Sequence, residues 1–341
     1  MKAVRFHEHG DVSVLRFEDA PDPRPAVGEA VVRVRACALN HLDLWQRRGM
    51  ERVKIPLPHI SGADVAGEVV EPGASGFAAG ARVMLQPGVS CGRCRACVSG
   101  RDNECPNYTV LGYMNDGGYA ELVKVPAANL VALPDGIGFV DAAAFPLTFL
   151  TAWHMLLTRA GLKAGEEVLV LAAGSGVGQA AIQIARLHGA RVFATAGTDE
   201  KLARARDLGA EAAINHHTDD VPKRIRELTN GRGVDVVVEH VGQATWERSV
   251  RCLARSGRLV TCGATTGPTG TVNLQFLFAR QLSLLGSYMG TKGELLEATP
   301  FLASGRLKPA VDRVYPLRDA AEAQQRLEKA GQFGKIVLTV E

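Results

Sequence analysis

Apolar and polar positions follow two different patterns along this chain. Up to about residue 150, short segments alternate apolar with polar residues and are broken by Gly or Pro at intervals of about 8 to 12 residues. Examples are residues 30–40 (AVVRVRACALN), 65–73 (VAGEVVEPG) and 81–88 (ARVMLQPG). This pattern is typical of half-buried strands, so the sequence predicts a β-rich, barrel-like first domain.

From residue 151 onward the predicted strands are almost wholly apolar. They cover residues 166–173, 191–197, 211–215, 234–241, 257–263 and 282–287. Amphipathic helical patterns, such as those over 177–189 and 199–209, separate them. Apolar strands that alternate with amphipathic helices predict an α/β domain whose parallel sheet is covered by helices on both faces.

The tail after Gly286 carries two more helical patterns, over 293–304 and 318–330, and ends in the strand pattern 335–341 (KIVLTVE). We expect this last strand to rejoin the first domain. The sequence therefore predicts one domain from residues 1–150 and 285–341, and a second from residues 151–284.

A glycine-rich turn joins the first apolar strand of the second domain to a helix. Glycines allow a tight turn and let the backbone approach a pyrophosphate, and the helix N-terminus offers unpaired N–H groups to it. Because more apolar strands follow, the turn predicts a dinucleotide site rather than a simple loop. The residues concerned are Gly174, Ser175, Gly176, Val177 and Gly178.

The end of the second strand bears on which dinucleotide binds. An NAD site usually ends that strand in Asp or Glu, which accepts from the ribose 2′-hydroxyl. Here Ala196 stands at that position, and Asp199 comes three residues later, where we expect it to cap the next helix. Lys201, one turn into that helix, could reach a phosphate. NADP(H) is therefore favoured over NAD(H), although no arginine stands in the loop.

Composition excludes several classes of partner. Hydrophobic residues make up 46% and charged residues 22% of the chain. The net charge is +3, and basic and acidic residues are interspersed along the sequence. No apolar run reaches the ~18 residues of a membrane span, and the N-terminus shows no signal segment. The densest basic stretch, residues 223–226, lies in a helical pattern typical of a solvated face. We expect neither a membrane nor a nucleic acid as partner.

Four of the seven cysteines form the pattern C-x2-C-x2-C-x7-C, which predicts a metal site. An iron–sulfur cluster is the main rival to zinc, but the bacterial ferredoxin run has only about three residues before its last cysteine. A lobe without metal is the other alternative. The remaining three cysteines lie in apolar segments without paired spacing. This predicts a reducing, cytoplasmic compartment. The four clustered cysteines are Cys91, Cys94, Cys97 and Cys105.

A β-rich domain, a dinucleotide-binding segment and a four-cysteine lobe, in this order, resemble the medium-chain dehydrogenase/reductase superfamily over essentially the whole chain. The resemblance implies a GroES-like first domain and a Rossmann, doubly wound second domain. In the zinc alcohol dehydrogenases of that family the lobe, here residues 90–106, binds a structural zinc away from the active site. Four thiolates also close a tetrahedral shell, so we expect one structural zinc per chain.

The catalytic zinc of those alcohol dehydrogenases has no matching ligands here. The three ligand positions carry Asn40, Ala63 and Leu147, an amide, a methyl and an isobutyl group. Asn40 in the run ACALN and Gly62-Ala63-Asp64 instead resemble the quinone oxidoreductase branch, as does Thr195-Ala196-Gly197-Thr198, which is similar to its NADPH loop. Many members of that branch lack the four-cysteine lobe, so the chain stands between the two groups.

Without a zinc ion, conjugated carbonyls and quinones are the easier hydride acceptors, because donors can stabilise the oxygen charge that forms. Asn40 could donate its amide N–H to that oxygen, or merely cap the following helix. The resemblance implies that His41 contacts the cofactor pyrophosphate. Asp64 could hold a neighbouring donor or act as an acid. The predicted catalytic residues are therefore Asn40, His41 and Asp64.

Further cofactor contacts are implied by the resemblance alone. They follow the ends of the fourth, fifth and sixth strands of the second domain, with one more basic position near the pyrophosphate. They are Val241, Gly263, Ser287 and Lys335. With the residues already named, the predicted cofactor site also includes Thr195, Gly197, Thr198 and Lys201.

Three functions remain open. The first is a zinc-independent NADPH reductase of quinones or α,β-unsaturated carbonyls. The second is an alcohol dehydrogenase whose zinc is held by rearranged ligands, drawn from His41, Asp43, His59 and Asp64. The third is a dinucleotide-binding protein without catalysis. We expect a small, apolar carbonyl or quinone as substrate. Because the apolar strand 282–287 would be exposed at a sheet edge, we also expect a homodimer or homotetramer.

Overall fold

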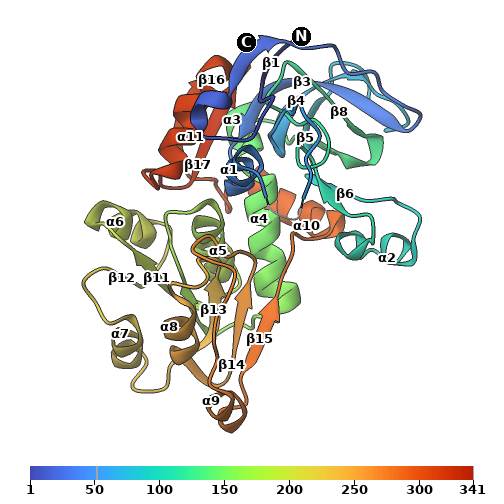
Figure 1. The fold of residues 1–341 in the computed structure, drawn as a ribbon. Helices are drawn as coiled ribbons and strands as arrows, with labels where there is room; N and C mark the ends of the chain where they lie inside the picture. The colour runs from blue at the N-terminus through green and yellow to red at the C-terminus, as the bar shows by residue number, and fades with distance from the viewer. Residues whose placement is uncertain (51–52, 341) are drawn as a thin grey trace. The chain divides into compact units, whose positions relative to one another are not determined.

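The computed structural model describes residues 1–50 and 53–340, which form two compact units (Figure 1). Unit 1 comprises Met1–Thr148 and Thr291–Glu341, and unit 2 comprises Phe149–Gly290. The predicted division, with a second domain of 151–284, differs from this by a few residues at each end. The first boundary falls inside helix α4 (Pro146–Trp153), which continues as a π-helical segment, His154–Arg159.

Unit 1 is built on a sheet in the order β16-β17-β3-β4-β5-β9, with β8 also paired to β3. Only the β16–β17 pair is parallel. The strands are β3 (Glu29–Ala38), β4 (Asp64–Glu71), β5 (Arg82–Leu85), β8 (Leu122–Pro126), β9 (Leu130–Ala132), β16 (Val311–Pro316) and β17 (Lys335–Thr339). Two small sheets pair β1 (Lys2–Arg5) with β2 (Arg16–Asp19), and β6 (Gly88–Val89) with β7 (Thr109–Val110).

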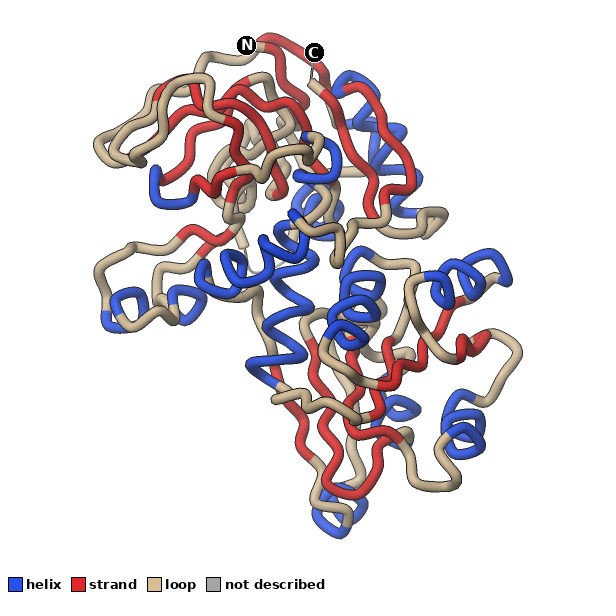
Figure 2. The backbone as a smooth tube through the Cα atoms, turned by 180° about the vertical axis from the view of Figure 1, so that it is seen from behind, coloured by secondary structure: helices blue, strands red, loops and turns tan. Residues whose placement is uncertain are grey.

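Short helices surround this sheet, as the tube view shows (Figure 2). The α-helices of unit 1 are α1 (His41–Arg48), α2 (Arg95–Val98), α3 (Phe139–Ala143), α10 (Lys292–Ala303) and α11 (Ala320–Glu328). One-turn 3-10 helices cover Val12–Val14, Asp102–Glu104, Ala127–Asn129 and Leu317–Asp319. The last strand pattern of the sequence does rejoin this unit, because β17 pairs with β3. Its final residue, Glu341, lies outside the described residues.

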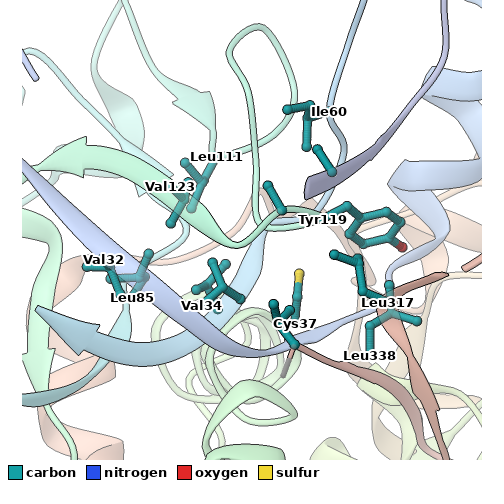
Figure 3. Packing of buried hydrophobic residues seen from close by; sticks show 14 of the residues in the cluster. Val32, Val34, Cys37, Ile60, Leu85, Leu111, Tyr119, Val123, Leu317 and Leu338 are labelled. Carbon is teal, nitrogen blue, oxygen red and sulfur yellow. The ribbon is translucent and has the colours of Figure 1, made fainter. Parts of the chain in front are cut away.

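The core of unit 1 lies against the inner face of the strands, where Val34, Cys37, Tyr119 and Leu338 pack together (Figure 3). Gly62 is required at this point. A Cβ there would lie 2.6 Å from the Tyr119 ring and 2.7 Å from the Cys37 sulfur, and its φ is +111°. The backbone that leads into β4 can therefore approach the core only as glycine.

Unit 2 contains a six-stranded parallel sheet in the order β12-β11-β10-β13-β14-β15. Counted along the chain this is the order 3-2-1-4-5-6 of a Rossmann sheet. The strands are β10 (Glu167–Val170), β11 (Arg191–Ala196), β12 (Ala212–Asn215), β13 (Val234–Glu239), β14 (Leu253–Thr261) and β15 (Ser283–Gly286). All six predicted strands are therefore present.

The helices of unit 2 follow the strands in alternation (Figure 1). They are α5 (Gly176–Leu187), α6 (Asp199–Asp207), α7 (Val221–Leu228), α8 (Trp246–Arg251) and α9 (Leu274–Ala279). Apolar side chains of the central strands, such as Leu169, Phe193 and Val237, form the core with Ile225 of α7. Across the described parts of both units, no helix combines the length and the apolar character needed to cross a membrane.

Candidate active site and metal centre

Pairing in the sheet of unit 1 brings distant parts of the chain to one point. Ala38, the last residue of β3, pairs with Asp64 of β4 on one side and with Val337 of β17 on the other. Because β17 runs antiparallel to β3, the same register places Lys335 opposite Asn40, the residue that begins the turn into α1. Asn40, Asp64 and Lys335 therefore meet at one end of the sheet.

The three side chains form a closed polar cluster. The Lys335 ammonium lies 2.9 Å from an Asp64 carboxylate oxygen and donates to the Asn40 amide oxygen at 2.7 Å. The Asn40 amide N–H donates to the same carboxylate oxygen at 2.9 Å. Lys335 is 2% exposed and Asp64 is fully buried, so little solvent screens this ion pair.

Asp64 also forms a hydrogen bond with the segment around Leu147, the third of the positions at which the zinc alcohol dehydrogenases carry a ligand. Its second carboxylate oxygen accepts from the backbone N–H of Leu147 at 2.7 Å. The positions of the family's zinc ligands, Asn40, Ala63 and Leu147, therefore do gather around Asp64. In the described structure, the positive charge beside Asp64 is the ammonium of Lys335.

The hydrogen-bonding capacity of Asn40 is largely used within this cluster. One amide hydrogen goes to Asp64, and the amide nitrogen also lies 3.4 Å from the Ala38 carbonyl. Asn40 is the N-cap residue of α1, and its backbone N–H donates to the Asp43 carboxylate at 2.8 Å. Lys335, by contrast, has three N–H groups, and two have these partners. A substrate contact through Asn40 stays a prediction.

Asp43 forms a second buried layer behind this cluster. Its carboxylate accepts from the Tyr119 hydroxyl at 2.9 Å as well as from the Asn40 N–H. Burial raises the pKa of Asp43 to about 6, because an ionised carboxylate without a counter-ion in contact is poorly solvated there. Burial likewise raises the pKa of Tyr119 well above its usual value.

The other two candidate ligands for a rearranged zinc differ in surroundings. His59 is buried, its Nε2 lies 2.9 Å from the Gly112 carbonyl, and its ring makes an edge contact with Phe6. His41 begins α1 and packs edge-on against Trp45, with ring centroids 5.0 Å apart. Its predicted contact with the cofactor stays a prediction.

The four-cysteine lobe has the geometry of a closed metal site. The sulfur atoms of Cys91, Cys94, Cys97 and Cys105 all lie within 4.8 Å of one another. The Cys91–Cys97 and Cys94–Cys97 separations are 3.9 and 3.5 Å. A tetrahedral zinc with Zn–S bonds of ~2.3 Å requires sulfur separations of ~3.8 Å. Hydrogen bonds from the backbone N–H groups of Arg93 and Cys94 lower the pKa of the Cys91 thiol to about 6.

The lobe is attached to the rest of unit 1 through its acidic 3-10 turn. Asp102 accepts from the backbone N–H of Lys292, at the start of α10, at 3.1 Å. The Lys292 ammonium donates to the Ala128 carbonyl. The residues present therefore fit one tetrahedral zinc, whose chemistry would be structural, because four thiolates leave no coordination position for a substrate.

In unit 2, the glycine-rich turn has the form that a pyrophosphate requires. Ser175 is the N-cap of α5, and its hydroxyl accepts from the Gly178 N–H at 2.8 Å. A Cβ at Gly178 would lie 2.3 Å from the Ala172 carbonyl oxygen, so only glycine lets the helix approach the turn. The predicted residues Gly174, Gly176 and Val177 belong to the same turn and first helical residues.

A buried carboxylate that sequence reasoning missed shapes the neighbouring loop. Glu239, at the end of β13, accepts from the backbone N–H groups of Val241 and Gly242 at 2.7 and 3.1 Å. It also accepts from the hydroxyls of Thr245 and Ser249 at 2.9 and 2.6 Å. The signal in the sequence was an acidic residue directly after the apolar run Val236–Val238.

The end of β11 differs in one detail from the prediction. Thr198, rather than Asp199, is the N-cap of α6, and its hydroxyl accepts from the Lys201 N–H at 3.3 Å. Thr195 is buried, and its hydroxyl accepts from the Ala172 N–H at 3.1 Å, which fastens β11 to the start of the glycine turn. Asp199 becomes the first helical residue because Thr198 already has the extended backbone of a cap.

Two further predicted contacts lie where β14 and β15 end. The Ser287 N–H donates to the Thr261 carbonyl at 2.8 Å, and its buried hydroxyl has no hydrogen-bond partner among the described residues. Gly263 lies two residues beyond β14. An orphaned hydroxyl of this kind suits a polar ligand group at the carboxyl ends of the strands. The residues of unit 2 therefore fit a bound dinucleotide, which would supply the hydride.

Comparisons with known proteins agree with this geometry. Residues 26–135 match the alcohol dehydrogenase GroES-like domain family, and residues 176–304 match the zinc-binding dehydrogenase family. An NAD-dependent alcohol dehydrogenase of Sulfolobus acidocaldarius is 31% identical, with 100% of both chains covered. The human quinone oxidoreductase is 30% identical over 99% of this chain and 97% of its own length.

A solved structure described as an NAD-dependent alcohol dehydrogenase has 48% sequence identity and a TM-score of 0.96, with 100% of both chains covered. The chain therefore belongs to the medium-chain dehydrogenase/reductase superfamily, as the resemblance predicts, and is an NAD(P)-dependent oxidoreductase. Its relatives include both alcohol dehydrogenases and quinone oxidoreductases.

Proposed function

We propose that this protein is a zinc-independent, NADP(H)-preferring reductase of quinones or α,β-unsaturated carbonyls. The observation that carries the proposal is the position of Lys335. Its ammonium lies against Asn40 and Asp64, among the segments that supply catalytic zinc ligands in related enzymes. A buried ammonium there would repel a zinc dication, and Asn40, Ala63 and Leu147 offer no thiolate or imidazole.

The same ammonium gives the site an electrophile that needs no metal. Hydride addition to the β-carbon of an enone, or to a quinone, moves negative charge onto a substrate oxygen. Lys335 has a third N–H for such an oxygen, while Asp64 and Asn40 hold its other two. Because these partners fix the ammonium before the substrate binds, it can stabilise the developing charge without reorganising.

The preference for NADP(H) rests on the end of β11, where Ala196 and Gly197 replace the acid of an NAD site. The small substrate that we propose matches the limited access to the cluster, where Asn40 is 7% exposed. A cytoplasmic location is supported by the seven cysteines, none of which forms a disulfide within the described residues.

The first experiment combines a substrate panel with metal analysis. We expect the purified protein to oxidise NADPH with at least one enone or quinone, to be unaffected by a chelator in that reaction, and to contain one zinc per chain. Absence of NADPH oxidation with every member of a broad panel would contradict the proposed function. Two zinc ions per chain, with alcohol oxidation lost on chelation, would favour an alcohol dehydrogenase instead.

Substitution of Lys335 tests its role directly. We expect Lys335→Met to lower kcat by about 10²-fold or more, because one preorganised charge is lost. The Kd of NADPH, measured separately, distinguishes this role from the pyrophosphate contact that the family resemblance implies for Lys335. Lys335→Arg should recover part of this activity. Lys335→Met also leaves Asp64 buried without its counter-ion, which costs about 3–5 kcal/mol of stability.

The double variant Asp64→Asn/Lys335→Met separates activity from folding. It removes both charges, so we expect it to be more stable than Lys335→Met and as inactive. Full activity in this stable double variant would contradict an electrophilic role for Lys335.

An alcohol dehydrogenase is the second candidate, and one observation favours it. The 48% identical structure carries the description of an NAD-dependent alcohol dehydrogenase. In that case Lys335 would have to leave its partners so that metal could enter. The alcohol panel with NAD⁺ and NADP⁺, with and without added zinc, distinguishes this candidate.

A further inference from the structure

Two adjacent histidines face the backbone at the end of β11. A Cβ built on Gly197 would lie 2.6 Å from Nε2 of His217 and 3.1 Å from Nε2 of His216. The two rings pack at 4.4 Å between centroids, with 68° between their planes. Both residues follow β12, the strand that pairs with β11, so their position is set by the parallel sheet.

Basic side chains from two other elements interact electrostatically with His216. Lys201 of α6 and Arg248 of α8 both lie close enough to His216 for their charges to lower its pKa, together with burial and His217. Burial is the largest cause. Four acids lie near the histidines in the chain or the fold. Asp199 and Glu200 are exposed in the first turn of α6, while Asp219 and Asp220 follow the histidines and accept from the backbone N–H groups of Asn215 and Lys223. The imidazole of His216 is therefore held neutral near pH 7 while no anion is bound.

A cavity of about 270 Å³ in unit 2 adjoins this cluster. Its lining is mainly apolar, as suits a flat aromatic ring, and His216 and Arg248 are among the polar residues that line it. The other lining residues include Leu171, Thr195 and Val241, at or just beyond the ends of β10, β11 and β13. This is the crevice in which a Rossmann sheet holds the adenosine half of its cofactor.

We propose that His216 and His217 form the subsite for the ribose 2′-phosphate of NADP(H), so that cofactor preference in this enzyme depends on pH. This inference rests on the NADP(H) preference proposed above. The side chain of an NAD-type acid is missing at Ala196, and the imidazole nitrogens face the adjacent Gly197. Lys201 and Arg248 supply permanent positive charge, and His216 gains its charge when the phosphate binds.

The direction of the pH effect follows from linkage. A bound phosphate raises the pKa of an adjacent imidazole, so NADPH binding takes up a proton at a pH where the free histidine is neutral. Affinity for NADPH therefore falls as the pH rises through the imidazole pKa of the complex. Ionisation of the 2′-phosphate itself, near pH 6, has the opposite effect, because the dianion binds more tightly. A fall between pH 6.5 and 8.5 thus reports the histidines.

Calorimetric titration of the full chain with NADPH and with NADH tests this proposal. Between pH 6.5 and 8.5 we expect the Kd of NADPH to rise severalfold, within the roughly tenfold limit that one pKa unit of coupling sets, and that of NADH to change by less than about twofold. At pH 7, titrations in two buffers with different ionisation enthalpies should show proton uptake with NADPH and none with NADH.

Matched variants identify the residues responsible. The double variant His216→Asn/His217→Asn should weaken NADPH binding at pH 6.5 up to roughly tenfold and abolish its pH dependence, and each single variant should do so in part. NADH binding should weaken much less, although His216 also lines the adenosine crevice. Lys201→Met should weaken NADPH binding at both pH values but keep the pH dependence. Equal loss of NADH affinity in the histidine variants would show a structural role and overturn the subsite.

The outcomes for the subsite and for the proposed function are distinct. A preference for NADPH that ignores both pH and the histidine substitutions overturns the subsite alone. Tighter binding of NADH at both pH values overturns the subsite and the NADP(H) preference together. Neither result depends on turnover, so the reduction of enones and quinones is tested separately by the substrate panel.

Discussion

Lys335 and Asp64 show how strongly single buried charges depend on their partners. Each is almost fully enclosed, and each is compensated by the other and by Asn40. A buried ion pair adds little net stability compared with apolar residues, but loss of one member is costly. The electrophilic role proposed for its ammonium would therefore explain the cluster better than a contribution to folding does.

The buried carboxyl group of Asp43 should make the stability of the protein depend on pH. Its pKa is raised to about 6 by burial, so the folded state holds a proton that the unfolded state releases near pH 4. The folded state binds more protons between these values, so stability falls as the pH rises. Relative to Asp43→Asn, the free energy of unfolding of the wild type should fall by about 3 kcal/mol between pH 4 and pH 7.

Urea unfolding of both proteins across this range measures the difference. The Tyr119→Phe variant serves as a second check, since it removes one donor to the carboxylate and should move the transition to higher pH. A difference between wild type and Asp43→Asn that stays constant with pH would contradict the raised pKa.

What the sequence predicted about single residues depended on local patterns. Asn40 and Asp64 were predicted as site residues because they stand in motifs that resemble those of the family, and the structure brings their side chains together. The partnership of Lys335 with them was missed, because it arises from the register of β17 on β3, across almost the whole chain. The histidine pair was missed for the same reason, since only the β11–β12 pairing brings residues 216 and 217 to Gly197.

At the scale of elements, the four-cysteine lobe buries few side chains, so we expect metal binding to be its main source of stability. Its two helical turns, α2 and the 3-10 turn, have no buried residues of their own, and Val98 is 72% exposed. Because so little apolar surface is buried there, the lobe should keep its structure only while zinc is bound.

Cys97→Ser tests this expectation. The substitution removes one of four ligands, so zinc should fall from one to nearly zero per chain, and the amides of residues 90–106 should lose their protection from hydrogen exchange. Cys262→Ala, at a cysteine outside the lobe, is the control and should keep both. Unchanged protection in a metal-free Cys97→Ser variant would show that the lobe folds without metal.

The type of most elements followed from periodicity, whereas their ends did not. All six strands of unit 2 were predictable, because buried parallel strands are continuous apolar runs. The boundary between the units was placed only approximately, because α4 passes through it without glycine and runs on into His154–Arg159. Asp199 was expected to cap α6, and the neighbouring Thr198 does so instead.

For the molecule as a whole, the edge strand β16 of unit 1 and the edge strand β15 of unit 2 differ in how they are protected. In unit 1, edge strand β16 carries Asp312, Arg313 and a terminal Pro316, residues that discourage pairing with another chain. In unit 2, edge strand β15 has the uncharged sequence SLLG. The preceding helix α9 exposes Leu274 and Phe278, at 68% and 70%. Of these two edges, β15 is therefore the one that we expect a second copy to cover.

We expect a homodimer in which β15 pairs with its counterpart across a two-fold axis, because an isologous contact covers both edges at once. Sedimentation velocity should give twice the 36.3 kDa mass of the chain, or four times if dimers pair further. Leu284→Lys places a charge on β15 and should shift the protein to monomers. Val314→Lys, on the exposed edge strand β16, is the matched control and should leave the assembly intact. A monomeric wild type, or a Leu284→Lys variant that assembles normally, would contradict pairing through β15.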